Sequence, residues 1–288
     1  MSYRKFPFFI TLIVLACPLL SLSAQQPQRV KLEYKFTRGE SWSWTFTRQD
    51  NLWFRLLIDR EPKVMDKKFG VSTISRYETI EIKPDGAIRL RRHNRLLSAD
   101  VEVKGGKEGT SVIQIEPAGA QAAPLGKLGF ETDLKLGQGF SLSFNWNDED
   151  FPPLPKEAVG EGDSWDDFVE FKHEGNAITA STLKLPVRST VMSLRDGDRP
   201  VVRIRRAGHV PVNVTFRVPV FEVEAKLRGV VTFTQTVHFD YERGRELGRE
   251  TQAHAQLEIE AEAPNGSKVR VDFISSTEAK KAEAKPGK

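Results

Sequence analysis

Apolar and polar residues alternate at every second position through most of this chain, and a period of two is typical of β-strands with one buried face. The clearest example lies before the C-terminus. Apolar residues from Val231 to Tyr241 alternate with polar ones, a turn follows at 242–245, and a second alternating row runs from Leu247 to Ala263. A third row begins after the Pro264, Asn265 and Gly266 turn. Strands this long bend or coil rather than stay flat. The sequence therefore predicts an all-β fold of long, bent antiparallel sheets, as an open barrel or a sandwich.

Small side chains occupy the apolar face of the middle strand of this predicted meander. Ala253 and Ala255 stand there beside Leu257 and Ile259. Small residues leave room for another sheet, a helix or a ligand, and packing is the commoner reason. We take as candidate ligand-binding residues this row and three tryptophans in turn-to-strand segments, for which core packing is the default explanation. They are Ala253, Ala255, Leu257, Ile259, Trp42, Trp44 and Trp165.

The N-terminus has the three parts of a secretory signal peptide. Arg4 and Lys5 precede an apolar run, and small residues at 21, 23 and 24 fit cleavage after Ser23 or Ala24. We therefore expect residues 1–24 to be removed and the mature protein to be periplasmic or secreted, with no transmembrane segment. Lipoprotein anchoring through Cys17 is the alternative, but Pro18 and further apolar residues follow where a polar linker is usual.

Cys17 is the only cysteine, so a mature chain without it has no disulfide, cysteine nucleophile or thiolate metal site. Removal of 24 residues from the 288-residue chain leaves 264, enough for one large β domain or two ordinary ones. The signal holds two of the basic residues, which lowers the formal net charge from +4 to +2. This near-neutral balance gives no footprint for nucleic acid.

A short internal sequence repeat suggests that the chain has two related halves. Gly39, Glu40, Ser41 and Trp42 recur as Gly162, Asp163, Ser164 and Trp165, and an Asp-Gly turn before an Arg-rich strand recurs at 85–92 and 196–206. Chance repetition of common turn chemistry is the alternative. We expect a first half at 27–150, a second at 151–276, possible continuity between them, and a disordered Lys/Ala/Glu tail at 277–288. Residues 118–127 are predicted to be a loop and residues 147–155 a linker.

The same residues resemble an uncharacterised family of secreted bacterial β-rich proteins. One element has the pattern Y-x-F-x-x-G-E-x-W, from Tyr34 to Trp42. Another has P-x(3)-V-x-x-G-D-x-W, from Pro155 to Trp165. The segment from Phe239 to Gly244 is similar to the late hairpin of that family. The resemblance implies a secreted or envelope β domain and brings no known activity, substrate or catalytic residue.

No pattern in the sequence marks catalytic, cofactor or metal-binding residues. The five histidines form no close pair, and His238 and His254 fall on the polar face of neighbouring strands. Acidic clusters at 147–150 and 163–167 lack the spacing of a calcium loop. The basic runs at 89–95 and 203–206 are expected to be solvated or to form cross-strand ion pairs; an anionic headgroup site is the alternative. We therefore expect no cofactor and no catalytic residue.

Three functional classes remain, in order of preference. The first is a non-enzymatic exported envelope protein that binds a lipid or other apolar ligand on a concave β-sheet, by analogy with periplasmic carriers. The second is a periplasmic protein-interaction module, two β-sandwich halves with filled cores that bind an envelope protein. The third is a hydrolase of envelope polymers, which needs convergent titratable groups.

Overall fold

The computed structural model describes residues 28–58, 61–100, 103–104, 108–115, 131–137, 140–145, 151–175, 178–218, 223–262, 266 and 268–284. The described chain is all-β, as the alternation predicts. One antiparallel sheet of 13 strands has the order β4-β6-β7-β8-β9-β10-β11-β12-β13-β1-β2-β3-β5. Its end strands β4 and β5 are not paired with each other in the described residues, so the sheet is open. The expected signal peptide, Cys17 and the loop at 118–127 lie outside the described residues.

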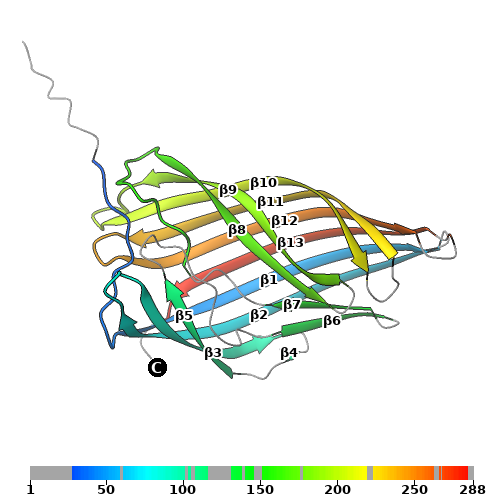
Figure 1. Ribbon diagram of the computed structural model, residues 1–288, viewed down its shortest axis with the longest axis horizontal. Helices are drawn as coiled ribbons and strands as arrows, with labels where there is room; N and C mark the ends of the chain where they lie inside the picture. Colours follow the sequence, from blue (N-terminus) through cyan, green and yellow to red (C-terminus); the bar gives the residue numbers. More distant parts are fainter. Residues whose placement is uncertain are drawn as a thin grey trace, which may run out of the picture.

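The strands are long, and the sheet coils so that β8 and β9 run obliquely to β12 and β13 (Figure 1). The bounds are β1 Ser41–Ile58, β2 Glu61–Ile82, β3 Ile88–Ala99, β4 Val103–Lys104, β5 Glu108–Ile115, β6 Glu131–Gly137, β7 Phe140–Asn145, β8 Ser164–Gly175, β9 Ile178–Ser193, β10 Val201–Val218, β11 Val223–Asp240, β12 Arg245–Glu262 and β13 Lys268–Glu283.

The predicted C-terminal meander is confirmed as β11, β12 and β13. Phe233 pairs with Ala253, and Ala253 pairs with Thr277. The turn between β11 and β12 uses Gly244 at φ 63°, a left-handed conformation that favours glycine. A register shift at His238 places that residue opposite Gly248. His238 and His254 are consequently not opposite each other.

The predicted disordered tail is wrong for residues 277–283. These residues complete β13, which pairs with β12 on one side and β1 on the other. Lys281 is only 5% exposed. The Lys/Ala/Glu composition suggested disorder, but a strand with two hydrogen-bonded neighbours forms its full backbone ladder whatever its composition.

The two repeated segments, 39–42 and 162–165, occupy equivalent places in the sheet. The Gly39 N–H donates to the Thr79 carbonyl at 2.8 Å, and the Gly162 N–H donates to the Val191 carbonyl at 2.9 Å. Both glycines have positive φ, 78° and 86°, and β1 or β8 begins two residues later. Gly86 between β2 and β3, and Gly197 between β9 and β10, also have positive φ. The units β1-β2-β3 and β8-β9-β10 therefore share entry turn, hairpin and second turn, within one continuous sheet.

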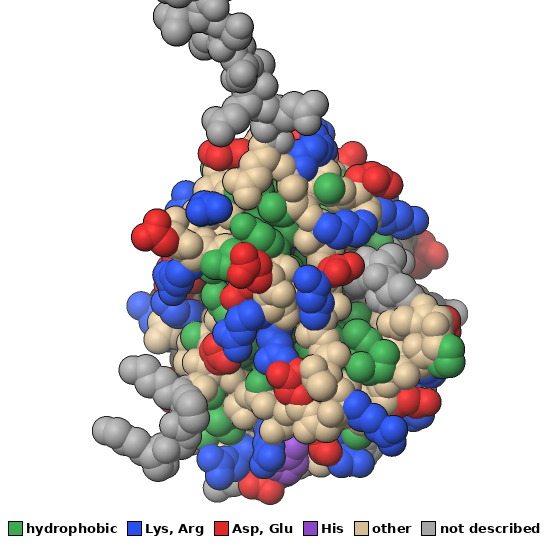
Figure 2. All heavy atoms as spheres, turned by 90° about the vertical axis from the view of Figure 1, so that its left-hand side faces the viewer, with side chains coloured by type: hydrophobic (Ala, Val, Ile, Leu, Met, Phe, Trp, Pro, Cys, Tyr) green, Lys and Arg blue, Asp and Glu red, His purple; other side chains and the backbone are tan. Residues whose placement is uncertain are grey.

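An extended N-terminal segment crosses one end of the sheet, at the left of Figure 1. Its Val30 forms a two-way backbone bridge to Val159, and the Lys35 N–H donates to the Gly244 carbonyl at 3.0 Å. Tyr34 joins two apolar clusters, with edge-on ring contacts to Phe151 at 5.3 Å and Phe239 at 5.4 Å. We call this the proximal end. Figure 2 shows it with charged side chains of both signs dispersed between small apolar patches.

The proximal end contains most of the buried core. Residues 151–159 contribute to it, so the predicted linker at 147–155 is wrong in its described part: Phe151 is 1% exposed and Leu154 7%. Burial of apolar side chains stabilises the folded protein by about 25 cal/mol per Å² of apolar surface removed from water. The two clusters are Val30, Leu32, Leu154, Val159, Val191, Leu194, Val202, Ile204, Val237 and Phe239, and Trp42, Trp44, Tyr77, Ile88, Leu90, Ile113, Ile115 and Phe151.

Strand β10 is internal near its start and an edge further along. Its register with β9 ends at the Ala207↔Arg188 pair, whereas its pairing with β11 continues to Val218. Pro211 lies beyond this point. A proline has no N–H to donate, and it is tolerated where one side of the strand is unpaired. Pro211 thus lies where β10 is an edge strand in the described residues.

Candidate functional site

A band of buried polar side chains crosses the middle of the sheet on its inner face, the face that also carries Trp44 and Ala253. Successive cross-strand partners form one row through β10, β11, β12, β13 and β1. The neighbouring rows add further charged groups. We call this set the polar belt: Arg48, Asp50, Asp167, Ser189, Arg206, Gln235, Glu246, Arg249, Thr251, Thr277 and Lys281.

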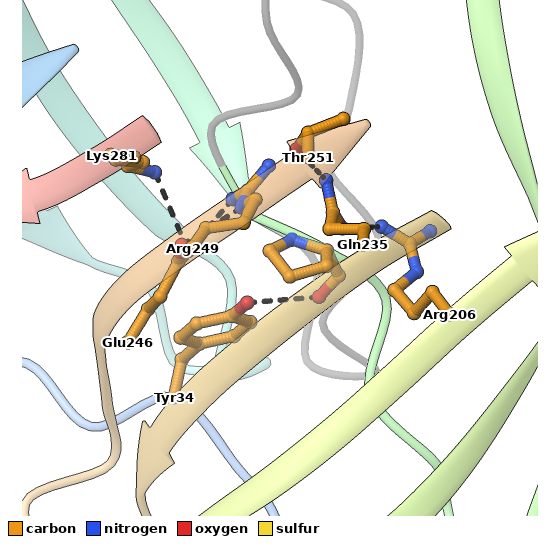
Figure 3. Close-up of polar contacts among 8 residues, drawn as sticks. Tyr34, Arg206, Gln235, Glu246, Arg249, Thr251 and Lys281 are labelled. Atoms are coloured by element: carbon orange, nitrogen blue, oxygen red, sulfur yellow. Dashed lines mark hydrogen bonds and ion pairs between the residues drawn. The ribbon is translucent and has the colours of Figure 1, made fainter. Parts of the chain in front are cut away.

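The most buried part of the belt is a charged triad. One Glu246 oxygen accepts from Arg249 Nη2 at 2.7 Å and lies 3.4 Å from Lys281 Nζ (Figure 3). The other oxygen accepts from Arg249 Nε at 2.8 Å, which makes the pair bidentate. The Glu246 and Arg249 side chains are 0% and 1% exposed. Burial alone would raise the pKa of Glu246, but the charges of Arg249 and Lys281 outweigh it and hold that pKa below its usual value.

A second buried group lies on β8, β10 and β11. Arg206 donates to Asp167 at 2.6 Å, and these side chains are 1% and 3% exposed. Arg206 also donates to the Gln235 side-chain oxygen at 2.8 Å, and the Gln235 amide donates to Thr251 at 3.1 Å (Figure 3). This chain of contacts links four strands, β8, β10, β11 and β12, and fixes the orientation of the Arg206 guanidinium.

A third group completes the belt on β1 and β13. Arg48 donates to both Asp50 oxygens at 2.8–3.1 Å, and the Thr277 hydroxyl donates to the same carboxylate at 2.5 Å. Asp50 is 2% exposed. Because every carboxylate described in the belt accepts from a cation, the belt can tolerate burial that isolated charges could not.

Beyond the belt, away from the proximal end, the inner face is apolar but incompletely covered. Phe233, Val231 and Val212 are buried, whereas the neighbouring side chains on β12 and β13 are only half-buried. Val214 on β10 is 42% exposed. A filled β-sandwich core would bury such a row almost completely. We call these half-buried residues the distal inner face: Val210, Leu227, Ala253, Ala255, Leu257, Ile259, Val271 and Phe273.

The opposite face of the same strands is polar. Along β12 the alternate residues are Glu250, Gln252, His254, Gln256 and Glu258, all exposed except the half-buried Glu258. Glu250 contacts Lys280 and Glu258 contacts Arg270 on this outer face. Between Glu250 and Glu258, β12 therefore presents its apolar side chains to the inside of the sheet.

The structure separates the residues that the sequence grouped as candidates. Ala253, Ala255, Leu257 and Ile259 all lie on the distal inner face. Trp42 and Trp44 are core residues, 8% and 3% exposed, in a stack with Tyr77 and Phe151. Trp165 is half-buried at the border between the proximal core and the belt. No single surface therefore holds all seven.

The belt itself was not anticipated. Strand alternation indicates that Arg92 faces away from Arg89 and Arg91, and this is what the structure has. The Arg89 and Arg91 side chains pair with Glu81 and Glu78 on the outer face. The usable signal was a polar residue breaking an apolar row, as Gln235 does between Phe233 and Val237 and as Arg249 does before Ala253. The expected solvated reading of the basic runs holds for the outer arginines and fails for Arg92 and Arg206, which are 4% and 1% exposed.

The described residues contain no group of three or more His, Cys, Asp or Glu side chains arranged to hold a metal ion. The same part of the chain contains no helix of the length and apolarity needed to cross a membrane.

Comparisons with known proteins give no family. No protein-family model matches the sequence, and no curated protein matches it. Among solved structures, the chain is similar to OccAB4 of Acinetobacter baumannii at 11% identity, covering 85% of this chain and 99% of that one, with a TM-score of 0.26.

Proposed function

We propose that this protein is an exported, non-enzymatic binding protein that holds an apolar ligand, such as a lipid chain, against the distal inner face. The observation that carries the proposal is the half-exposure of that face in an otherwise well-covered inner surface. Ala255, Leu257 and Ile259 are half-buried. The belt residues Gln235 and Arg249 are only 2% and 1% exposed. Half-exposed apolar surface is stabilised by a ligand that removes it from water, at about 25 cal/mol per Å².

The placement of polar groups supports the same proposal. The outer face of β12 and β13 is charged, so an apolar ligand has one favourable side of the sheet. The small side chains of Ala253 and Ala255 leave the sheet surface low, and Gly229 at φ 147° provides no side chain opposite Leu257. Together these three positions form a strip of low surface between larger apolar neighbours, and we call this strip the lane.

The test is native mass spectrometry with lipid extraction on mature protein secreted with its own signal. The proposal expects a co-purified lipid or other apolar molecule and binding of the fluorescent apolar probe N-phenyl-1-naphthylamine. Ala255→Trp places an indole in the lane and should abolish both signals. Gln256→Trp, the next residue on the same strand but on the outer face, is the matched control and should abolish neither.

A mass corresponding to the bare protein, with no probe binding by the folded wild type, would contradict the proposal. Equal loss in the Ala255 and Gln256 variants would also contradict it, because a site on the inner face cannot be blocked from the outer one. Circular dichroism of each variant verifies that the sheet has formed.

A further inference from the structure

A cross-strand row at the proximal side of the distal inner face combines donors and a buried ion pair. Trp165 on β8 pairs with Ser189 on β9, and Ser189 pairs with Arg206 on β10. All three lie on the inner face. Opposed side chains on neighbouring strands have Cβ atoms about 4.5–5.5 Å apart, so one small group can reach two of them.

In the described part of the chain, a serine hydroxyl and an indole N–H of this row are buried without a hydrogen-bond partner. They are the Ser189 hydroxyl, on a residue that is 0% exposed, and the Trp165 indole N–H. Buried side-chain polar atoms in folded proteins are nearly always paired, because an orphaned one costs about 1–3 kcal/mol. A ligand oxygen that accepts from both would remove this cost on binding.

The unit β1-β2-β3 contains a row equivalent to this row of β8-β9-β10, and comparing the two rows shows how they differ. There Trp42 pairs with Tyr77, and Tyr77 pairs with Arg92. The Tyr77 ring stacks on Trp42 with centroids 5.6 Å apart and is 1% exposed. The Trp42 N–H also has no partner, so the indole alone does not distinguish the rows. The difference is a short hydroxyl at 189 where the other row has a packed aromatic ring.

The apolar face begins directly beside this row. Val187, the next inward residue of β9, packs with Phe233 and Ala253, and Val231 and Ala255 follow one row further. Along β12, the eight steps from Thr251 to Ile259 extend about 26 Å at ~3.3 Å per residue. An acyl chain in one leaflet of a bilayer spans about 15 Å, half of a ~30 Å hydrocarbon core. One such chain fits between the row and the far end of the lane.

We propose that the ligand is a single-chain amphiphile with a carboxyl oxygen at its polar end. The oxygen accepts hydrogen bonds from Ser189 and Trp165, beside the Arg206–Asp167 pair, and the chain lies along the distal inner face. This inference rests on the proposed apolar site and adds the chemistry of the ligand's head. Both a free fatty acid and a fatty-acid ester carry such an oxygen.

The experiment measures binding of palmitic acid, methyl palmitate and N-phenyl-1-naphthylamine to the mature protein, using Ser189→Ala. Loss of the hydroxyl should weaken the oxygen-bearing ligands about tenfold, the effect of one hydrogen bond, and leave the naphthylamine unchanged. Thr190→Ala, the neighbouring residue on the outer face, is the control and should change nothing. Weakening of the acid alone assigns a carboxylate, and weakening of acid and ester together assigns a neutral carbonyl; either supports the proposal.

Equal affinity of wild type and Ser189→Ala for both palmitates, with the naphthylamine still bound, would overturn the head-group assignment and leave the apolar site standing. Failure of the wild type to bind any of the three would overturn both. Because the variant removes an orphaned hydroxyl rather than a contact, it is expected to fold with undiminished stability, which urea unfolding verifies.

Discussion

The ammonium of Lys281 lies 3.5 Å from the centre of the Trp44 ring and 3.4 Å from a Glu246 oxygen. A lysine seven residues from the chain's end is thereby fixed between an aromatic face and a buried carboxylate. Cation–π contacts of desolvated groups are worth up to about 2 kcal/mol. The extreme C-terminal strand is thus part of the polar belt and of the proximal core.

A first prediction concerns chain length. A protein ending at residue 276 loses the Thr277–Asp50 hydrogen bond, the Lys281 contacts, and the pairing of seven residues with β1 and of six with β12. We expect a large fall in thermal stability or failure to fold. A protein ending at residue 284 keeps the whole of β13 and should unfold like the full chain. Thermal unfolding followed by circular dichroism compares the two proteins. Equal unfolding midpoints would refute a structural role for residues 277–283.

The second prediction compares two glutamates on one strand. Glu246→Gln removes the carboxylate that Arg249 and Lys281 both contact, and breaking a buried ion pair costs about 3–5 kcal/mol. Glu250→Gln breaks the Glu250–Lys280 pair on the outer face, where both side chains are more than 60% exposed. Such pairs contribute about 0–1 kcal/mol. Urea unfolding should show a much larger loss of unfolding free energy for Glu246→Gln than for Glu250→Gln. Similar losses would show that burial does not strengthen the contribution of the Glu246 ion pairs to stability.

The pH dependence of stability provides a third prediction. Because the pKa of Glu246 is lowered in the folded protein, its ionised form stabilises the fold at pH values above the unfolded-state pKa of about 4.3. This contribution is lost as the pH falls through the folded-state pKa. The difference in unfolding free energy between wild type and Glu246→Gln should therefore be constant near neutral pH and shrink below about pH 4. A difference that persists unchanged to pH 2 would argue against an ionised Glu246.

Prediction from sequence succeeded for the features that follow directly from the two-residue period of β-strands. Strict alternation indicated the meander and the inward direction of Ala253 and Ala255. It failed where a charged residue lies on the buried face. Glu246 and Arg249 are three residues apart, a spacing that strict alternation places on opposite faces of a strand. Arg249 and Lys281 become neighbours only through the register of β12 with β13. Their mutual compensation is a tertiary property that no local pattern encodes.

A fourth prediction tests the equivalence of the two entry turns. Gly39 and Gly162 have positive φ and open space around a hypothetical Cβ, so alanine at either meets backbone strain alone. We expect Gly39→Ala and Gly162→Ala to cost about 1–2 kcal/mol each. Gly109→Ala, in equally open space but without positive φ, should be neutral or slightly stabilising. Chemical denaturation measures all three, and a large difference between the first two would show that the turns are not equivalent.

The position of β13 has a consequence for how the chain must fold. Strand β1 begins at residue 41, yet one of its two partners is β13, and Trp44 pairs with Glu283 across 239 residues of sequence. Contacts this remote carry a high loop-closure entropy and slow the search for the native state. The hairpins β1–β2 and β11–β12 can form early, but β1 and β13 can pair only after residues 268–283 have been synthesised. We therefore expect the pairing of β1 with β13 to be a late step in folding.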